Sequence, residues 1–274
     1  MCALILAALL AAGPPQRIIS TAPSITEMLY ELGLGDRVAA VTMYCHYPPD
    51  ARQKPKIGTY LSPDLEAMLR VQPDLIVTLE SAPNVKNKLP ALKVPVLVLR
   101  NDTIPHILES MVTLGERTGV TAAARQRVAA IENDLRAVQA RTAKLPRRTV
   151  MFVVGRTPGT VQDLVVVGGG SYLNDLLERA GGRNVFADTR VTYPKISREE
   201  LLARRPEVII DMGDMADTDA VTEAHKRSIV DLWKTVAPWA RVYAVASDIF
   251  VVPGPRVAAA ARELGRMIQP EAAW

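Results

Sequence analysis

Apolar and polar residues alternate along this chain in two kinds of pattern. Short runs rich in valine, isoleucine and leucine predict buried strands, and the segments between them carry apolar residues every three or four positions, as amphipathic helices do. The expected strands are residues 17–21, 38–42, 75–79, 94–99, 149–154, 208–211 and 242–246. Strands that alternate with helices predict an α/β fold whose central sheets are mainly parallel and flanked by helices.

Helix starts are marked by capping residues. Ser24 and Glu27 have the spacing of a capping box, which predicts a helix that opens at Ser24 and ends near Gly33. Ser62 followed by Pro63 predicts a second helix, with Ser62 as the cap and Pro63 at the first helical position. Further helices are expected over residues 171–180, 198–205 and 255–268.

One segment, residues 121–144, contains neither glycine nor proline and is rich in strong helix formers. It predicts a single helix about 36 Å long. Its apolar residues form one stripe, at Val128, Ile131, Leu135 and Val138. A stiff helix over residues 120–146 would join an N-terminal lobe of residues 17–119 to a C-terminal lobe of residues 147–274.

The chain contains an internal repeat. Residues 60–77 match residues 193–210 at a constant offset of 133 positions without a gap. The matched pairs include Tyr60 and Tyr193, Glu66 and Glu199, Leu69 and Leu202, Pro73 and Pro206, and Asp74 and Glu207. Each copy reads as a loop tyrosine, a capped helix, a turn proline and a buried strand, which predicts two related lobes. The alternative is that two unrelated units of this kind share a composition.

Composition and motifs restrict the function. The 33 basic and 29 acidic residues leave a net charge of +4 that is scattered along the chain, so nucleic-acid binding is not expected. No nucleotide-binding fingerprint, nucleophile elbow or zinc-protease motif occurs, so we expect no catalytic residues and no enzyme. The 3 histidines are widely spaced, which argues against a bare metal-ion site.

The N-terminus carries an apolar run over residues 3–12 that is too short to span a bilayer. Its length suits a secretory signal peptide, so residues 1–16 are expected to direct export out of the cytoplasm. No basic residue precedes the run, which a start placed further upstream would explain; an ordinary strand or tail is the alternative. Cys2 lies in this segment, so only Cys45 would remain in the exported chain.

Short segments throughout the chain resemble the helical-linker class of ABC-importer binding proteins, which carry vitamin B12, haem and ferric siderophores. In the first lobe they are residues 17–20, 23, 26–27, 44–49, 57–59, 64–66 and 73–77, and in the second 181–182, 184–186, 188–191, 197–199, 247–248 and 255–256. The resemblance is strongest to the vitamin B12-binding members. It implies a monomer without a cofactor that holds its ligand between the lobes and delivers it to a permease dimer with its ATPase.

The resemblance also implies roles for individual residues. Glu66 and Glu199 occupy the positions that dock onto arginine pockets of the permease, although a helix dipole alone also favours an acid there, by about 0.3–1 kcal/mol. The positions on or near the ligand pocket are Tyr44, Tyr60, Tyr193, Phe250, Cys45, His46, Asp248 and Arg256. The vitamin B12-binding members have tryptophans where this chain has Tyr60 and Tyr193, and another near Leu79.

The chemistry of these side chains fits a large cyclic ligand. Aromatic faces cover a macrocycle, and tyrosine hydroxyls bond to its polar rim. Cys45 and His46 have the donor atoms of axial metal ligands, or are a buried thiol and a loop histidine, and a deprotonated Tyr44 can ligate haem iron. Arg256 and Arg156 either meet ligand amides or phosphate, or lie in solvent.

We therefore expect an exported binding protein that carries a corrinoid such as cobalamin to an ABC importer. A carrier of ferric siderophores or haem from the same class is the first alternative. An enzyme of related two-lobed architecture, such as a tetrapyrrole metal chelatase, is the alternative from a different class.

Overall fold

The computed structural model describes residues 13–82, 87–213 and 221–274. Most of the expected signal segment, including Cys2, lies outside these ranges. The chain divides into two compact units. The first runs to Asn101 and includes Pro105–Ala130, and the second comprises Asp102–Ile104 and Ile131–Trp274; we call them the N-terminal and C-terminal lobes. No helix within the described ranges combines the length and the apolar character needed to cross a bilayer.

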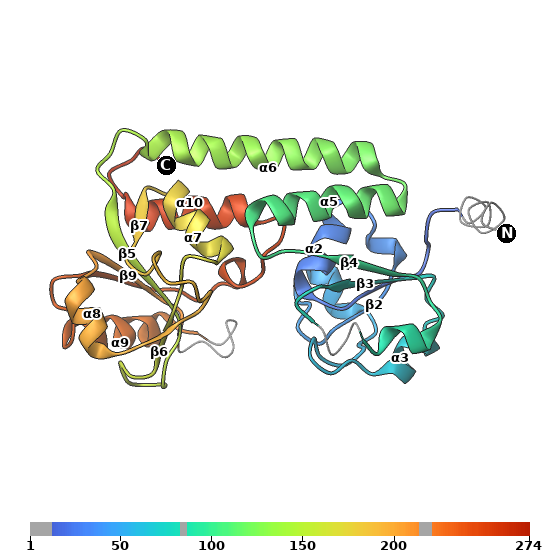
Figure 1. Ribbon diagram of the computed structural model, residues 1–274, viewed down its shortest axis with the longest axis horizontal. Helices are drawn as coiled ribbons and strands as arrows, with labels where there is room; N and C mark the ends of the chain where they lie inside the picture. The colour runs from blue at the N-terminus through green and yellow to red at the C-terminus, as the bar shows by residue number, and fades with distance from the viewer. Residues whose placement is uncertain (1–12, 83–86, 214–220) are drawn as a thin grey trace. The chain divides into compact units, whose positions relative to one another are not determined.

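The N-terminal lobe is built on a parallel sheet of four strands in the order β2-β1-β3-β4. Its strands are β1 (Ile18–Ser20), β2 (Val38–Val41), β3 (Leu75–Leu79) and β4 (Val96–Leu99), and its helices include α2 (Pro23–Glu31), α3 (Leu65–Arg70) and α5 (Ile104–Thr118). Ile19 and Ile76 on one face of the sheet share a core with Met68 of α3. Helices α3 and α5 lie on opposite sides of this sheet (Figure 1).

The C-terminal lobe has a larger, mixed sheet in the order β10-β9-β5-β6-β8, with β7 also paired to β5. Its strands are β5 (Arg148–Gly155), β6 (Leu164–Val166), β7 (Gly182–Asn184), β8 (Lys195–Ile196), β9 (Val208–Asp211) and β10 (Arg241–Ala244), and its helices include α7 (Tyr172–Arg179), α8 (Arg198–Arg204), α9 (Glu223–Lys234) and α10 (Val257–Ile268). Leu201 of α8 and Trp233 of α9 pack in one core against Ile209. In Figure 1, α8 and α9 lie on the side of this sheet opposite α7 and α10.

The two lobes share a four-stranded parallel unit. In the C-terminal lobe the order β7-β5-β9-β10 is wholly parallel, as β2-β1-β3-β4 is in the N-terminal lobe. Among the strands of the described residues, β6 and β8, which pair antiparallel, have no counterpart in the N-terminal sheet. The internal repeat of the sequence falls on equivalent elements, α3 with β3 and α8 with β9. Gln72 and Arg205, which are matched in the repeat, both have left-handed backbones just where the two helices end, with φ of 46° and 43°.

An exposed carboxylate just before a buried strand links each repeat to the neighbouring strand. Asp74 accepts hydrogen bonds from the backbone amides of Gln16 (2.7 Å) and Arg17 (2.9 Å), just before β1. Glu207 accepts from the backbone amide (2.7 Å) and hydroxyl (2.9 Å) of Thr149 in β5. We call these two interactions the carboxylate clamps. Each one sets the register at the start of the central strand pair of its lobe, β1 with β3 and β5 with β9.

The long helix is confirmed as α6 (Thr121–Thr142). Three of its four stripe residues, Ile131, Leu135 and Val138, are buried. The division between the lobes falls inside this helix, after Ala130.

Helices α5 and α9 were not assigned from the sequence. Pro105 and Gly115 interrupt the pattern of α5, yet both fit the helix. Pro105 lies in the first turn, where a backbone N–H has no helical partner. Gly115 allows close packing, because a Cβ there would lie 2.4 Å from the Cβ of Ala124 on α6.

The capping box expected at Ser24 and Glu27 is wrong. The helix begins at Pro23, with Ala22 at the cap position and no side-chain cap. The fixed φ of proline suits the first helical position, so the helix starts before Ser24. The Ser24 hydroxyl instead accepts a hydrogen bond from the side-chain amide nitrogen of Asn101 (3.1 Å).

The clamp at Glu207 predicts a specific response to acid. The backbone hydrogen bond from Thr149 is the main cause that lowers the pKa of Glu207 from its ordinary value of 4.5, and burial opposes it. A lowered folded-state pKa stabilises the protein above pH 4.5, and this contribution is lost as the pH falls through the folded-state value. In urea unfolding below pH 4.5, the unfolding free energy should therefore fall less steeply for Glu207→Gln than for the unmodified protein.

Thr149→Val provides the graded control for this experiment. It removes the hydroxyl donor but keeps the backbone donor, so its pH dependence should lie between the other two. Equal slopes for Glu207→Gln and the unmodified protein would contradict the role assigned to the clamp.

Candidate functional site

Exposed tyrosines gather on the loops of the N-terminal lobe. The loop after β2 carries Met43, Tyr44 and Tyr47, which are 52%, 60% and 43% exposed. The backbone amide of Met43 donates to the carbonyl of Gly58 (2.9 Å), which ties this loop to the one that carries Tyr60. Large apolar side chains in such numbers on adjoining loops are not needed by the core of the lobe, and they indicate a binding surface.

Tyr60 lies at the same edge of the sheet as Tyr44. Its hydroxyl is 2.8 Å from that of Ser81, two residues after β3 ends. Tyr44 follows the end of β2, and parallel strands end at a common edge. In α/β proteins, ligands bind outside the carboxyl ends of the strands. Tyr44 and Tyr60 are thus placed where this fold presents ligand contacts.

The two residues after Tyr44 differ in burial. Cys45 is fully buried, and its sulfur lies 3.1 Å from the hydroxyl of Thr26 and 3.2 Å from that of Thr42. His46 is exposed, and its Nε2 lies 3.1 Å from the carbonyl of Met43. The thiol therefore packs inside the lobe, and the imidazole stays at the surface. The metal-ligand role of both residues stays a prediction.

In the C-terminal lobe, Tyr193 and Val191 form a second exposed patch. They are 42% and 58% exposed. The hydroxyl of Ser171, which also caps α7, donates to the Tyr193 hydroxyl (3.3 Å). This hydrogen bond orients the ring of Tyr193 while leaving much of the side chain open.

The other expected ligand residues of this lobe follow β10. Asp248 and Arg256 form an ion pair at 2.9 Å and are partly buried. Phe250 is only 2% exposed, with its ring 5.7 Å from that of Phe152 in an edge-on contact. Of the aromatic residues expected at the ligand, Phe250 therefore lies in the core, whereas Tyr44, Tyr60 and Tyr193 have exposed or partly exposed rings.

Arg156 lies in the interior and not at the surface. It pairs with Asp211 at 2.8 Å, and both side chains are fully buried. Asp211 also accepts hydrogen bonds from the indole of Trp233 and from the backbone amide of Gly213 (2.7 Å). A buried charge of this kind needs its partner, so the pair holds the end of β9 against β5.

Glu66 and Glu199 are exposed in the first turns of α3 and α8. Asp64 caps α3 by accepting from the amides of Glu66 and Ala67, both at 3.0 Å. Ser197, the counterpart of Asp64 in the repeat, caps α8 in a capping box with Glu200. The cap expected at Ser62 is therefore wrong. One oxygen of the Asp64 carboxylate accepts from both amides, whereas Ser62 belongs to the preceding turn, where its backbone amide donates to the hydroxyl of Thr59 (3.0 Å).

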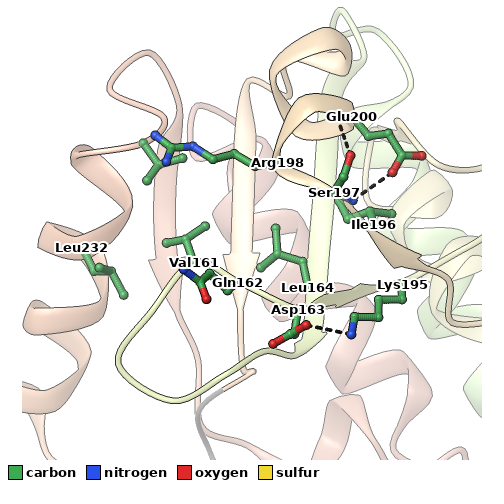
Figure 2. A pocket seen from close by; sticks show the side chains of 11 residues that line it. Val161, Gln162, Asp163, Leu164, Lys195, Ile196, Ser197, Arg198, Glu200 and Leu232 are labelled. Carbon is green, nitrogen blue, oxygen red and sulfur yellow. Dashed lines mark hydrogen bonds and ion pairs between the residues drawn. The ribbon is translucent and has the colours of Figure 1, made fainter.

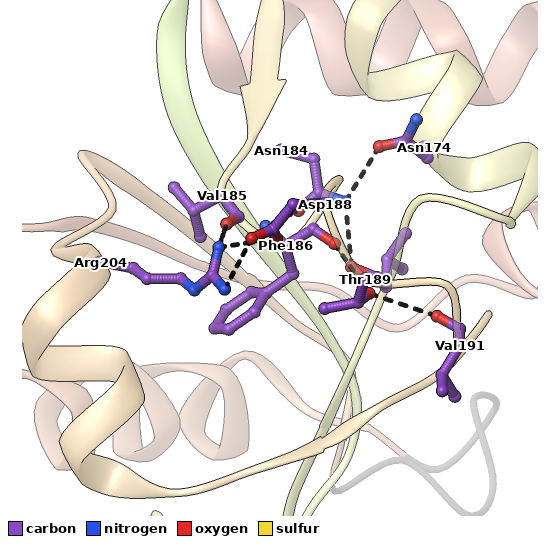
Figure 3. A network of polar contacts seen from close by, with 9 residues as sticks. Asn174, Asn184, Val185, Phe186, Asp188, Thr189, Val191 and Arg204 are labelled. Atoms are coloured by element: carbon purple, nitrogen blue, oxygen red, sulfur yellow. Dashed lines mark hydrogen bonds and ion pairs between the residues drawn. The ribbon is translucent and has the colours of Figure 1, made fainter.

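Figure 3 shows how α8 is fixed to the loop that precedes it. Arg204 donates to both carboxylate oxygens of Asp188 (2.8 and 3.0 Å) and to the carbonyl of Val185. Its guanidinium also lies over the ring of Phe186, 4.7 Å from the ring centre. The hydrogen bond from Arg204 lowers the pKa of Asp188 from its ordinary value. This loop continues to Val191 and Tyr193, so the same contacts support both the helix and the exposed patch.

A pocket of about 670 Å³ lies beside the start of α8 (Figure 2). Ser197, Arg198 and Glu200 line it together with the ion pair of Asp163 and Lys195, which measures 2.7 Å. Hydrogen bonds from Lys195 and Thr157 lower the pKa of Asp163. Neither Glu199 nor any of the expected ligand residues is among the residues that line this pocket.

The side chains that sequence reasoning missed lie next to those it found. Tyr47 and Met43 share the exposed loop of Tyr44, and Val191 shares that of Tyr193. Two tyrosines three residues apart in a proline-rich loop were the available signal for Tyr47. Among the described residues no group of three or more histidine, cysteine, aspartate or glutamate side chains is placed to hold a metal ion.

Comparison with known proteins gives a consistent result. A model of the periplasmic binding protein family matches residues 18–251. The vitamin B12-binding protein of Yersinia pestis (strain Pestoides F) is 30% identical over 252 residues, which are 91% of this chain and 85% of that relative.

Two solved structures share the fold over almost the whole chain. The periplasmic vitamin B12-binding protein BtuF of Vibrio cholerae has a TM-score of 0.74 at 23% identity, covering 94% of this chain and 98% of that one. A periplasmic haem-binding protein of Pseudomonas aeruginosa has a TM-score of 0.78 at 25% identity, covering 94% of both chains.

The caps that position Glu66 and Glu199 can be tested by truncation. Asp64→Ala and Ser197→Ala should each lower the free energy of unfolding by about 1 kcal/mol, because each leaves backbone amides without an acceptor. Ser62→Ala, the matched control, should stay within about 0.5 kcal/mol of the unmodified protein. Urea unfolding followed by circular dichroism measures all three. A larger loss of unfolding free energy for Ser62→Ala than for Asp64→Ala would show that Ser62, and not Asp64, caps α3.

Proposed function

The chain belongs to the periplasmic binding protein family, and from this membership we propose that it captures a corrinoid such as cobalamin and delivers it to an ABC importer. Members of the family are substrate-binding proteins of transport systems and not enzymes, and they work outside the cytoplasm. The observation that carries the corrinoid proposal is the 30% identity to a vitamin B12-binding protein over 91% of the chain.

Tyrosines with exposed or partly exposed side chains supply the contacts that such a ligand needs. Tyr44, Tyr47 and Tyr60 in the N-terminal lobe and Tyr193 in the C-terminal lobe offer flat apolar faces for a macrocycle. The hydroxyls of Tyr60 and Tyr193 are already held by Ser81 and Ser171, which fixes the rings before a ligand arrives. Rings that are oriented in advance lose less entropy on binding.

Glu66 and Glu199 are proposed to dock the loaded protein onto the permease. Each is an exposed carboxylate on a capped helix, and the repeat places one on each lobe. Two equivalent acids suit a partner with twofold symmetry that offers a basic group on each half. Charged contacts of this kind steer the encounter and select the orientation.

A haem or ferric-siderophore carrier is the second candidate. Two observations favour it: the fold is shared with a haem-binding protein at a TM-score of 0.78, and Tyr44 and His46 lie exposed on one loop. Phenolate and imidazole are both known ligands of haem iron. The metal-chelatase alternative has less support, because the family to which the chain belongs transports its substrates.

Export is proposed to depend on the segment at residues 1–16. The family implies a location outside the cytoplasm, and an apolar run of this length is typical of a signal peptide.

Calorimetric titration tests the ligand. Cyanocobalamin should bind the purified protein at a one-to-one ratio, and Tyr60→Ala and Tyr193→Ala should each weaken the affinity by about tenfold, because each removes an aromatic face. Tyr60→Phe keeps the face and should retain most of the affinity. Saturable binding of haem or a ferric siderophore, with no heat from cyanocobalamin at tens of micromolar protein, would reject the corrinoid and keep the carrier class.

Charge reversal tests the docking residues. The double variant Glu66→Arg/Glu199→Arg should bind ligand as the unmodified protein does but should reduce ligand uptake at least about a hundredfold, because two attractive contacts become repulsive. Uptake is measured with radiolabelled cyanocobalamin in cells of the source organism that lack the chromosomal copy. Glu132→Arg, an exposed acid on α6, is the matched control and should leave uptake unchanged. Normal uptake with the double variant would remove both glutamates from the docking surface.

A further inference from the structure

Two exposed leucines accompany the paired glutamates. Leu69 on α3 is 49% exposed, and Leu202 on α8 is 46% exposed. They are matched in the internal repeat, and each follows its glutamate by three positions. Residues three apart in a helix lie on the same face, so each helix presents a carboxylate and a leucine side by side.

The core does not require either leucine. In α3 the neighbouring Met68 is fully buried, and in α8 the equivalent Leu201 is fully buried. These two residues already anchor the helices to their sheets. A single exposed leucine is ordinary on a protein surface. Here two leucines lie at equivalent positions, each beside an exposed acid, and their exposed fractions are nearly equal. This indicates that α3 and α8 contact equivalent surfaces of one partner.

We propose that Leu69 and Leu202 complete the docking surface of each lobe, by entering an apolar groove that adjoins the basic group of the permease. The inference rests on the proposed docking of Glu66 and Glu199. The occupant is a twofold-symmetric membrane permease, because a carboxylate beside an apolar side chain, present once on each lobe, complements a basic group beside an apolar groove on each half of a dimer. The acid steers and orients the partner, and the leucine adds contact area that excludes water from the ion pair.

The charged residues near the two leucines differ between α3 and α8, so few exposed positions are the same on both helices. Glu66 is followed by Arg70, whereas the equivalent of Arg70 on α8 is Ala203. Arg198 precedes Glu199, and its equivalent on α3 is Leu65. Glutamate and leucine are thus the exposed pair that both helices keep, and the basic side chains are not.

Binding to the reconstituted importer tests the inference. The permease–ATPase complex of the source organism's vitamin B12 importer is placed in lipid nanodiscs, and association of the full chain is followed by biolayer interferometry. Leu69→Gln and Leu202→Gln should each weaken binding by about tenfold, and the double variant by about a hundredfold. Glutamine keeps the helix propensity of the position, so the folded state should be retained. Cyanocobalamin affinity and the melting temperature should stay unchanged.

Controls separate this inference from the docking proposal beneath it. Val96→Thr, at an exposed apolar position on β4, should bind the importer normally. Leu69→Met/Leu202→Met keeps apolar side chains at both positions and should retain most of the binding. Normal binding by the glutamine double variant, while Glu66→Arg/Glu199→Arg abolishes binding, would overturn the role of the leucines and leave the docking glutamates in place. If the glutamate variants also bind normally, both proposals fail. A loss confined to one leucine would overturn the matched role.

Discussion

Each lobe depends on a carboxylate that closes the turn between a helix and a central strand. Asp74 and Glu207 follow the turn prolines and accept hydrogen bonds from the backbone at the start of the neighbouring strand. Without such an acceptor, the amides of Gln16 and Arg17 would lose their partner just where the first strand enters the sheet. The clamp sets the register of β3 against β1 and of β9 against β5. The exposed pairs Glu66/Leu69 and Glu199/Leu202 lie on α3 and α8, the helices that lead into β3 and β9.

The position of the clamps explains why matched residues are exposed on both lobes. A helix that is capped at its start and clamped after its end presents the same outward positions in both lobes. Asp64 and Ser197 cap the helices with different side chains, and Gln72 and Arg205 end them in the same left-handed backbone. The chemistry of a cap or turn can therefore change between the copies while the geometry stays. Both helices have a buried apolar residue that packs against the sheet and an exposed glutamate in the first turn.

The two lobes diverge where the C-terminal sheet gains β6 and β8. These strands bring Asp163 and Lys195 together and form the pocket beside α8. Tyr193 lies just before β8 and its hydroxyl bonds to Ser171, whereas the hydroxyl of Tyr60 bonds to Ser81, which follows strand β3 of the parallel unit. The hydroxyls of the two matched tyrosines are thus held by residues from non-equivalent parts of the two lobes.

Much of this arrangement follows from the sequence by itself. The alternation of strands and helices predicted the α/β class, an uninterrupted run of helix formers predicted α6, and the repeat singled out Tyr60, Glu66 and their counterparts. These signals are local or periodic, so they can be recognised in the sequence without knowledge of tertiary contacts. The helix starts at Pro23 and Leu65 were misplaced, because several residues in a row had the chemistry of a cap and only the backbone geometry chooses among them.

Burial was decided by the tertiary structure. The side chains of Phe250, Cys45 and Arg156 are buried against Phe152, Thr26 and Asp211, which are distant in the chain, and the sequence did not identify these partners. Leu69 and Leu202 look like core residues, yet they are exposed, because Met68 and Leu201 fill the space beneath the helices. A sequence states which side chains are apolar or charged. Which of them face water depends on contacts between segments far apart in the chain, and those exist only after folding.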